Sequence, residues 1–587
     1  MMIFHACHEL PFTQIHIVDT EFFGDDGDQK TPVCLVVREL LSGEVRRYWM
    51  DELRQMDQPP FDIGPDALFV AFFASAEFSV FLALGWGLPA NIFDCHAEFR
   101  CQTNGETLPF GNGQIGALQY FGITDGDQIA KDDMRARILT GGPWSSDERL
   151  AILDYCQSDV DGLAMLFSAM LARWPLGLMD LDQVLARGRY VATVAQMEHR
   201  GVPIDTRTLN LMRDNWHEFK QALIEKTDQA YGVYDKGSFR THLFERYLGA
   251  QDIAWPRLAS GELQLDRDTF KMMALRYPQL AELRELRKTL AEMREIKLTV
   301  GRDGRNRTLL SPFQSKTGRN QPSTTRFIFG LPAWARSLIK PEPGTALAYL
   351  DFSSQEIAIA ACLSGDDALW QAYASGDPYI QFAIDAGLAP VGATKESHKA
   401  ERDACKVIML GVQYGMSAYG MGQKANLHVL EAEDLLQRHK DVYHTFWKWA
   451  GQNVEAGLAS QEIHTIFGWK IRAGKGRDVK ENTFLNWPMQ ANGAEMLRLA
   501  CIALEEAGIG ICAPVHDAIL IEAPLDAIDQ HVARATYEMQ KASGWVLGRG
   551  RQCRVDAEIV RWPDRYIDGR GADMWSFIKS RLGEEAV

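Results

Sequence analysis

The sequence predicts a multidomain protein that combines an α/β domain with α+β domains. At 587 residues the chain is too long for a single hydrophobic core. Its first part alternates apolar, strand-like runs with helical periodicity, whereas the rest contains long helical stretches and few strands. We therefore expect a boundary near residue 185, which separates a domain at 1–185 from a larger region at 186–587.

The predicted N-terminal domain begins with strands and ends with a long helix. Runs rich in β-branched and aromatic residues predict the strands, and apolar residues at helical spacing predict the helix. The predicted strands are 15–22, 33–40 and 67–73, and the predicted helix is 147–174.

The second region is predominantly helical up to about residue 300. A Gly-, Ser-, Thr- and Pro-rich connector with scattered Arg follows, and strands return later. The expected elements are a helix at 280–298, the connector at 300–327, a strand at 345–352, helices from about 355 to 465 and a strand–turn–strand at 511–523.

Charge is distributed unevenly along the chain. The formal net charge of −16 disfavours nucleic acid as a partner, because phosphate-binding surfaces are basic. The window 283–340, however, holds thirteen Lys and Arg against four Asp and Glu, a local balance of +9. This window could be a solvated helix face or a phosphate-binding surface.

Cysteine usage and the absence of targeting signals favour a cytoplasmic protein. The ten cysteines form no Cys-x-x-Cys pair and no zinc spacing, and the N-terminal residues do not resemble a signal peptide. The apolar segment 67–88 is long enough to span a membrane, but it holds Glu77 and lacks basic flanks. We expect a buried strand and a buried helix there, and no membrane association.

A first group of acids lies in the predicted N-terminal domain. Asp19 and Glu21, in "VDTE", project from the same face of a strand, and Glu77 ends another apolar run. Tyr155 and Asp159 are four residues apart on one helical face. Four carboxylates that converge can bind two Mg²⁺ or Mn²⁺ ions and activate water against a phosphodiester. The alternative is four unrelated surface acids.

A second pair of acids ends two apolar strands far apart in the sequence. Asp351 closes "LAYLDF", and Asp517 lies within the apolar run "PVHDAILIEAP". An ionised carboxylate in such surroundings is costly unless a cation or a hydrogen bond compensates it. We expect the two aspartates to share a two-metal site, with a buried salt bridge as the alternative for Asp517.

A stripe of cations lies between these acids. Arg402, Lys406, Leu410 and Tyr414 are spaced by four, and each step advances only about 40° around a helix. Two cations on one face suit a triphosphate, with the tyrosine near its base and sugar. An ordinary amphipathic helix would give a similar apolar pattern.

These residues resemble the motifs of the family A DNA polymerases, the group of bacterial DNA polymerase I and many phage replicases. The segment "DFSSQE" (351–356) resembles motif A, the stripe from Arg402 to Gly415 resembles motif B, and "VHDA" (515–518) resembles motif C. The resemblance covers essentially the whole chain, as in the large (Klenow-type) fragment, without a preceding 5′-nuclease domain.

The resemblance implies an RNase H-like 3′–5′ exonuclease domain followed by a right-hand polymerase domain. Within residues 186–587, the subdomains it implies are the thumb at about 206–315, the palm at about 316–395 and 500–587, and the fingers at about 396–499.

The implied activity is template-directed DNA synthesis from dNTPs on a primed template. Asp351 and Asp517 would hold two Mg²⁺ ions, with Mn²⁺ as a substitute, for two-metal phosphoryl transfer. Arg402 and Lys406 would grip the triphosphate, and Lys406 is a catalytic candidate for protonating the pyrophosphate.

Other positions would contact the nucleotide or the DNA. Tyr414 would pack beside the templating pair, and Glu356 would exclude the ribose 2′-hydroxyl. Leu410 and Tyr379 occupy positions that contact the incoming nucleotide. The implied DNA contacts are Arg319 in "TGR", Gln490 in "NWPMQANGAE" and His516, which would contact the primer end.

In the N-terminal domain the resemblance implies proofreading. Asp19, Glu21, Glu77 and Asp159 would bind the metal ions, and Tyr155 would orient the attacking water. The expected partners are primer–template DNA and dNTPs. We expect a monomer of the phage, prophage or plasmid replicase type, whose replisome partners the sequence does not identify.

Six positions depart from the family pattern. Ala518 stands where motif C has a glutamate, Leu410 where motif B has an aromatic residue, Tyr379 where a histidine is usual and Asn482 where an arginine is common. In the N-terminal domain Glu77 replaces an aspartate and Phe73 an asparagine. These positions bear on nucleotide selectivity and on exonuclease competence.

Two other functions are compatible with part of the pattern. A single-subunit RNA polymerase shares the three motifs, but Glu356 and the exonuclease-like half argue against it. A non-catalytic DNA-binding scaffold would explain the departures, but the Asp351/Asp517 pair and the cationic stripe argue against decay.

Overall fold

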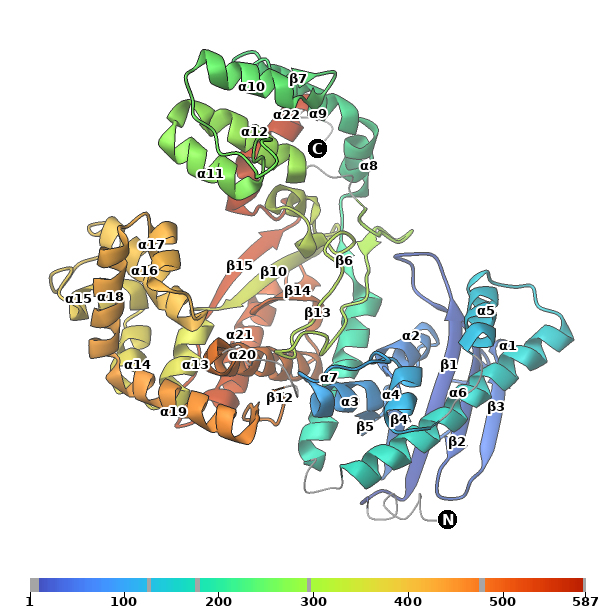
Figure 1. The fold of residues 1–587 in the computed structure, drawn as a ribbon. Helices are drawn as coiled ribbons and strands as arrows, with labels where there is room; N and C mark the ends of the chain where they lie inside the picture. The colour runs from blue at the N-terminus through green and yellow to red at the C-terminus, as the bar shows by residue number, and fades with distance from the viewer. Residues whose placement is uncertain (1–9, 124–127, 175–179, 293–296, 474–480, 584–587) are drawn as a thin grey trace. The chain divides into compact units, whose positions relative to one another are not determined.

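The computed structural model describes residues 10–123, 128–174, 180–292, 297–473 and 481–583 (Figure 1). Compactness divides the chain into two units. Unit 1 comprises Met1–Gly201, Leu309–Pro322 and Pro343–Arg561, and unit 2 comprises Val202–Thr308, Ser323–Glu342 and Trp562–Val587.

Unit 1 opens with a five-stranded mixed sheet. Its strands are β1 (Gln14–Phe23), β2 (Thr31–Glu39), β3 (Val45–Trp49), β4 (Ala67–Ala71) and β5 (Ile92–Asp94), in the order β3-β2-β1-β4-β5. The pairs β1–β2 and β2–β3 are antiparallel, whereas β1–β4 and β4–β5 are parallel.

Helices surround this sheet. They are α1 (Met50–Leu53), α2 (Ser75–Ala83), α3 (Cys95–Thr103), α4 (Gln114–Tyr120), α5 (Gln128–Leu139), α6 (Ser146–Arg173) and α7 (Leu181–Arg200). Helix α6 packs on β1 and β2, and α7 packs on β5 and α2 (Figure 1). Ser145 caps α6 in a capping box with Glu148, which explains why the helix begins there.

The apolar segment 67–88 forms a buried strand and a buried helix, as predicted. All five residues of β4 are buried, and Glu77 in α2 is only 4% exposed. In the described part of the chain, no helix combines the length and the apolarity needed to cross a membrane.

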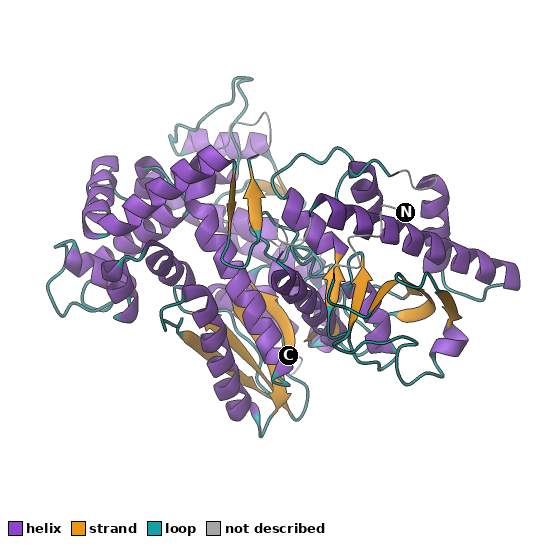
Figure 2. Cartoon of the chain, turned by 90° about the horizontal axis from the view of Figure 1, so that it is seen from below, coloured by secondary structure: helices purple, strands orange, loops and turns teal. Residues whose placement is uncertain are grey.

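A second, antiparallel sheet forms the other half of unit 1. Its strands are β10 (Thr345–Phe352), β13 (Gly510–Val515), β14 (Ala518–Pro524) and β15 (Val555–Arg561), in the order β13-β14-β10-β15. Figure 2 shows these sheets as the main strand-rich parts of a predominantly helical chain.

The remaining elements of unit 1 are mostly helices. They are α13 (Gln355–Ser364), α14 (Asp367–Ala374), α15 (Pro378–Asp385), α16 (Lys399–Gln413), α17 (Ala418–Ala425), α18 (Val429–Val442), α19 (His444–Ser460), β11 (Glu462–His464), β12 (Lys470–Arg472), α20 (Glu481–Glu506) and α21 (Ile528–Leu547). Helix α21 packs on β10 and β15, and α20 packs on α21 and α13.

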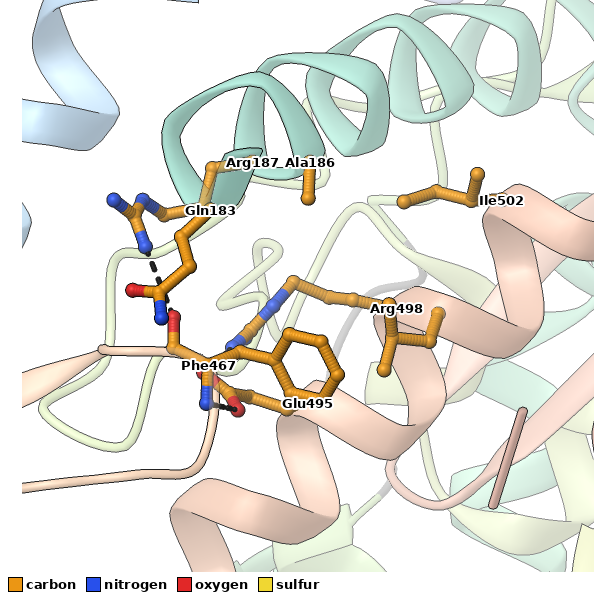
Figure 3. Close-up of a pocket in the computed structure, with 8 residues that line it drawn as sticks. Gln183, Ala186, Arg187, Phe467, Glu495, Arg498 and Ile502 are labelled. Carbon is orange, nitrogen blue, oxygen red and sulfur yellow. Dashed lines mark hydrogen bonds and ion pairs between the residues drawn. The ribbon is translucent and has the colours of Figure 1, made fainter. Parts of the chain in front are cut away.

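Helix α7 joins the two sheets of unit 1. It contacts β5 on one side and β13 and α20 on another. Arg187 in α7 forms a buried ion pair with Glu98 in α3, with N–O distances of 2.5 and 2.9 Å. Arg187 also donates to Phe467 O at 3.2 Å, and Phe467 N donates to Glu495 in α20 at 3.0 Å (Figure 3). Breaking such a buried pair on one side typically costs about 3–5 kcal/mol.

Unit 2 is built from short helices and small strand pairs. Its elements are β6 (Val202–Pro203), α8 (Thr206–Asp214), α9 (Trp216–Asp228), β7 (Tyr234–Asp235), β8 (Ser238–Phe239), α10 (Thr241–Ala250), α11 (Arg267–Arg276), the 3₁₀ turn η2 (Pro278–Leu280), α12 (Ala281–Glu292), β9 (Arg305–Asn306), the 3₁₀ turns η3 (Ile328–Gly330), η4 (Ala333–Leu338) and η5 (Gly569–Gly571), and α22 (Ala572–Leu582). An aromatic cluster around Phe244 and Phe270 forms a separate small core.

Most predicted elements are confirmed. The strand predicted at 345–352 is β10, the strand–turn–strand at 511–523 is β13 and β14, and the helix at 147–174 is α6. The helix predicted at 280–298 is seen as α12 up to Glu292, and part of its predicted end lies outside the described residues. The boundary predicted near residue 185 falls within α7.

Candidate active sites

Strand pairing brings the two predicted aspartates together. Asp351, near the end of β10, lies opposite Ala518, the first residue of β14. Asp517 precedes Ala518 in the turn between β13 and β14, and Phe352 N donates to Asp517 O at 3.3 Å. His516, the other residue of this tight turn, adopts a positive φ of 58°. Its side chain is exposed.

The electrostatics of Asp351 indicate a cluster of like charges. Burial, and then the charges of Asp517 and Asp556, raise the pKa of the Asp351 carboxyl to about 7. Among the described residues, Asp351 Oδ1 finds no hydrogen-bond partner although it is buried. A buried carboxylate oxygen without a donor, beside a second carboxylate, fits the oxygen ligands that Mg²⁺ and Mn²⁺ prefer.

The cationic stripe lies on α16, as the spacing predicted. Arg402 pairs with Asp377 at 2.5 Å, and its guanidinium lies 5.2 Å from the centre of the Tyr379 ring. Lys406 Nζ lies 5.6 Å from the same ring centre, and Lys406 is exposed. Tyr379, which the sequence placed at the triphosphate, therefore packs against both cations. Leu410 is half-buried on the next turn.

Glu356 and Tyr414 lie near the aspartate pair. Glu356, in the first turn of α13, forms an ion pair with Arg319 at 3.5 Å. Burial raises the pKa of Glu356, Arg319 opposes that shift, and the charge of Asp517 adds to it. Burial and then the charge of Glu356 raise the pKa of the Tyr414 hydroxyl, with a smaller contribution from Asp517. Tyr414 is 49% exposed, so its ring is available to a ligand.

Gln490 lies on α20 close to the same region. Gln355, beside Glu356, donates from its side-chain amide to Gly493 O at 3.2 Å. A Cβ on Gly493 would approach Gln355 Oε1 to 2.7 Å, so glycine permits this close packing of α20 on α13. Gln490 lies about one helical turn before Gly493 on α20, and its side chain is half-buried.

The N-terminal acids also converge. Possible ligand atoms of Asp19, Glu21 and Cys156 all lie within 4.8 Å of one another. Burial and then Asp19 raise the pKa of Glu21 well above its usual value, and Asp159 and Glu77 contribute to that shift. The structure therefore brings together the four predicted acids, which come from β1, α2 and α6.

Glu77 and Tyr155 complete this cluster. Burial, and then Asp19, raise the pKa of Glu77 well above its usual value. In the described ranges Glu77 Oε2 is buried and finds no hydrogen-bond partner. Burial and the charge of Asp159 raise the pKa of the Tyr155 hydroxyl, whose hydrogen bond to Asp159 contributes to the shift. Carboxylates with a buried, unsatisfied oxygen again fit a divalent cation.

Two residues at these sites were not predicted. Cys156 is buried, and its thiol donates to Asp19 Oδ2 at 3.2 Å. Asp556 in β15 lies directly opposite Asp351. Cys156 follows Tyr155 directly, but nothing in its spacing indicates a ligand. Asp556 shares no motif with Asp351, and only the strand register reveals the contact.

Comparisons with known proteins identify similar chains. The model of DNA polymerase family A matches residues 244–559. The thermostable DNA polymerase I of Thermus caldophilus is 30% identical over 213 residues, which are 34% of this chain and 25% of that protein. The corresponding protein of Thermus filiformis is 24% identical over 404 residues, which are 64% of this chain and 48% of that protein. The chain thus matches between a quarter and a half of the length of these relatives.

A solved structure has the same fold over nearly the whole chain. It is the POL domain of Pol1 from M. smegmatis, in complex with DNA primer-template and dNTP, and its TM-score is 0.68. The likeness covers 93% of this chain and 95% of that one at 18% sequence identity.

We expect Glu77→Gln to stabilise the metal-free protein above neutral pH. The pKa of Glu77 is higher in the folded state than in the unfolded state. The stability that protonation of Glu77 contributes is therefore fully present below about pH 4.5, and it is lost as the pH rises through the folded-state pKa. Glutamine keeps the shape and removes the charge. In EDTA, the Tm difference between variant and wild type should be small at about pH 5 and should grow toward about pH 8.

The exposed Asp57 supplies the control, since Asp57→Asn should leave the Tm unchanged across this range. A Glu77→Gln curve that runs parallel to the wild-type curve at every pH would show that Glu77 carries no buried charge.

Proposed function

We propose that the chain, which belongs to DNA polymerase family A, synthesises DNA on a primed template from deoxynucleoside triphosphates. The observation that carries the proposal is the meeting of Asp351 and Asp517 near Glu356 and Tyr414, with the cations of α16 gathered on Tyr379. The relatives named DNA polymerase I, and the fold shared with a polymerase domain solved with primer-template and dNTP, support it.

Asp351 and Asp517 would hold two Mg²⁺ ions in this reaction. When bound there, such ions lower the pKa of an attacking hydroxyl and neutralise a leaving pyrophosphate. Arg402 and Lys406 bind the triphosphate, and Lys406, which is exposed, is the group placed to protonate the pyrophosphate. The Tyr379 ring lies within cation–π distance of both cations, which is how a neutral side chain would contribute to a triphosphate site.

Residues around the aspartates select and orient the substrates. Glu356, which pairs with Arg319, would exclude the ribose 2′-hydroxyl of an incoming nucleotide. Tyr414 and Leu410 face the base and sugar of the incoming nucleotide. The proposed DNA contacts are Arg319, Gln490 and His516.

We also propose that the N-terminal site removes mismatched 3′ ends. Asp19, Glu21, Glu77 and Asp159 would hold the metal ions, which supply an activated water and stabilise the leaving oxygen of a phosphodiester. Tyr155, hydrogen-bonded to Asp159, orients that water. In this proposal residues 1–185 form the exonuclease domain and 186–587 the polymerase domain, with thumb, palm and fingers as the sequence implies.

Asp351→Asn and Asp517→Asn should each nearly abolish primer extension. Losing several kcal/mol of transition-state stabilisation slows extension by about three orders of magnitude or more. Extension with Mg²⁺ and four dNTPs measures the rate, and fluorescence anisotropy should show that primer–template binding persists. Asp526→Asn, at an exposed aspartate between β14 and α21, should extend normally. A rate near wild type for either active-site variant would refute the metal assignment.

Asp19→Ala combined with Glu21→Ala should remove digestion of a mismatched 3′ end while extension of a matched primer stays unchanged. The two changes delete half of the acids that would hold the ions. A gel of end-labelled mismatched primer without dNTPs measures digestion, and Asp57→Ala is the matched surface control. Unchanged digestion in the double variant would place the exonuclease site elsewhere.

Glu356→Ala should raise ribonucleotide incorporation by about tenfold or more relative to deoxynucleotides, because the side chain that excludes the 2′-hydroxyl is gone. Competition between rNTPs and dNTPs in extension assays measures the ratio. Glu396→Ala, at an exposed position before α16, is the control. No rise in the ratio removes Glu356 from the role of gate, and a wild-type enzyme that prefers rNTPs would instead indicate an RNA polymerase.

A further inference from the structure

Asp351 has two directly opposite neighbours in its sheet. One is Ala518 in β14 and the other is Asp556 in β15. Residues directly opposite in an antiparallel pair project from the same face, with Cβ atoms about 4.5–5.5 Å apart. Asp556 therefore occupies the face that carries the candidate polymerase site, on the side of β10 away from Ala518.

Two acids directly opposite each other destabilise a sheet. No Lys, Arg or His side chain pairs with Asp351, Asp517 or Asp556 within the described ranges. Asp351 Oδ1 is also buried without a hydrogen-bond donor. Asp556 is exposed and Asp351 is half-buried, so the two carboxylates are accessible to a divalent cation that would bind both.

Asp556 is held in position by the loop that follows Asp351. Ser353 Oγ donates a hydrogen bond to Asp556 Oδ2, and Ser353 N donates to Arg554 O at 2.9 Å. The hydroxyl binds one carboxylate oxygen of Asp556, so the side chain is oriented while its second oxygen can face the site. An acid that only protected an edge strand would not need this restraint.

We propose that Asp556 is the third carboxylate of the polymerase metal site. The inference rests on the proposed function and adds to it a residue that no motif identifies. A carboxylate from Asp556 would also compensate for the loss of the acid that motif C has at the position of Ala518. The carboxylate lost on one side of Asp351 is replaced by one on its other side, so the negative charge facing the metal ions is retained.

Mn²⁺ binding by the full-length chain tests this proposal without relying on activity. In an Asp19→Ala, Glu21→Ala background, whose exonuclease acids are reduced, the electron paramagnetic resonance signal of free Mn²⁺ counts the bound ions. Adding Asp556→Asn should weaken Mn²⁺ affinity by about tenfold or more. Asp556→Glu, which keeps the charge, should recover most of that affinity.

Glu558→Gln is the matched control. Glu558 is an exposed acid two residues along β15, on the same face, but opposite Tyr349 instead of Asp351. Its replacement should leave Mn²⁺ affinity unchanged. In EDTA, Asp556→Asn should also raise the Tm because it removes the repulsion from Asp351, and this measurement verifies that the variant folds.

The outcomes separate this inference from the proposed function. If Asp351→Asn weakens Mn²⁺ binding but Asp556→Asn behaves like Glu558→Gln, Asp556 is not part of the site and the polymerase assignment stands. If Asp351→Asn also leaves binding unchanged, both the metal assignment and this inference are overturned. Loss of affinity with Asp556→Asn that Asp556→Glu restores supports the inference.

Discussion

The pairing of β10 with β14 and β15 is the constraint on which the proposed polymerase site depends. It sets Asp351 beside Asp517 and Asp556, although like charges 4 Å apart repel by about 4 kcal/mol at an effective dielectric constant of 20. Burying one large aliphatic side chain contributes about 1.5–3 kcal/mol. The strands bury several such side chains completely, among them Leu350, Ile519 and Ile521. Packing therefore outweighs the repulsion, and the acids meet because the sheet cannot form otherwise.

The same principle operates at the N-terminal site with a different set of elements. Strand β1 and the helices α2 and α6 position Asp19, Glu77 and Asp159 so that the charges of all three act on Glu21. Helix α7 then ties this sheet to the second one, through the Glu98–Arg187 pair and the link from Phe467 to Glu495. Within unit 1, the two candidate sites are thus parts of one continuously packed structure.

Sequence patterns predicted the parts of each site that local periodicity encodes. Asp351 and Asp517 each adjoin an apolar strand, and Arg402 and Lys406 share a helical stripe, so spacing alone was informative. Asp556 is more than 200 positions from Asp351, and only strand register brings them together. Cys156 reaches Asp19 through the packing of α6 on β1. The boundary predicted near residue 185 falls within α7. This helix contacts both sheets, and its helical periodicity continues without interruption past residue 185.

The two sites differ in the charges that surround their acids, and this difference separates their chemistry. At the proposed polymerase site, Arg402 and Lys406 lie close to the Tyr379 ring, and Arg319 pairs with Glu356. At the N-terminal site, burial is the main cause of the raised pKa of Glu21, and the groups that add to it are other acids and the Cys34 thiol. A triphosphate carries more negative charge than a phosphodiester, so it requires cationic side chains in addition to metal ions. The acid-rich N-terminal site suits the single charge of a phosphodiester, whereas the four-stranded sheet and α16 together suit a nucleoside triphosphate.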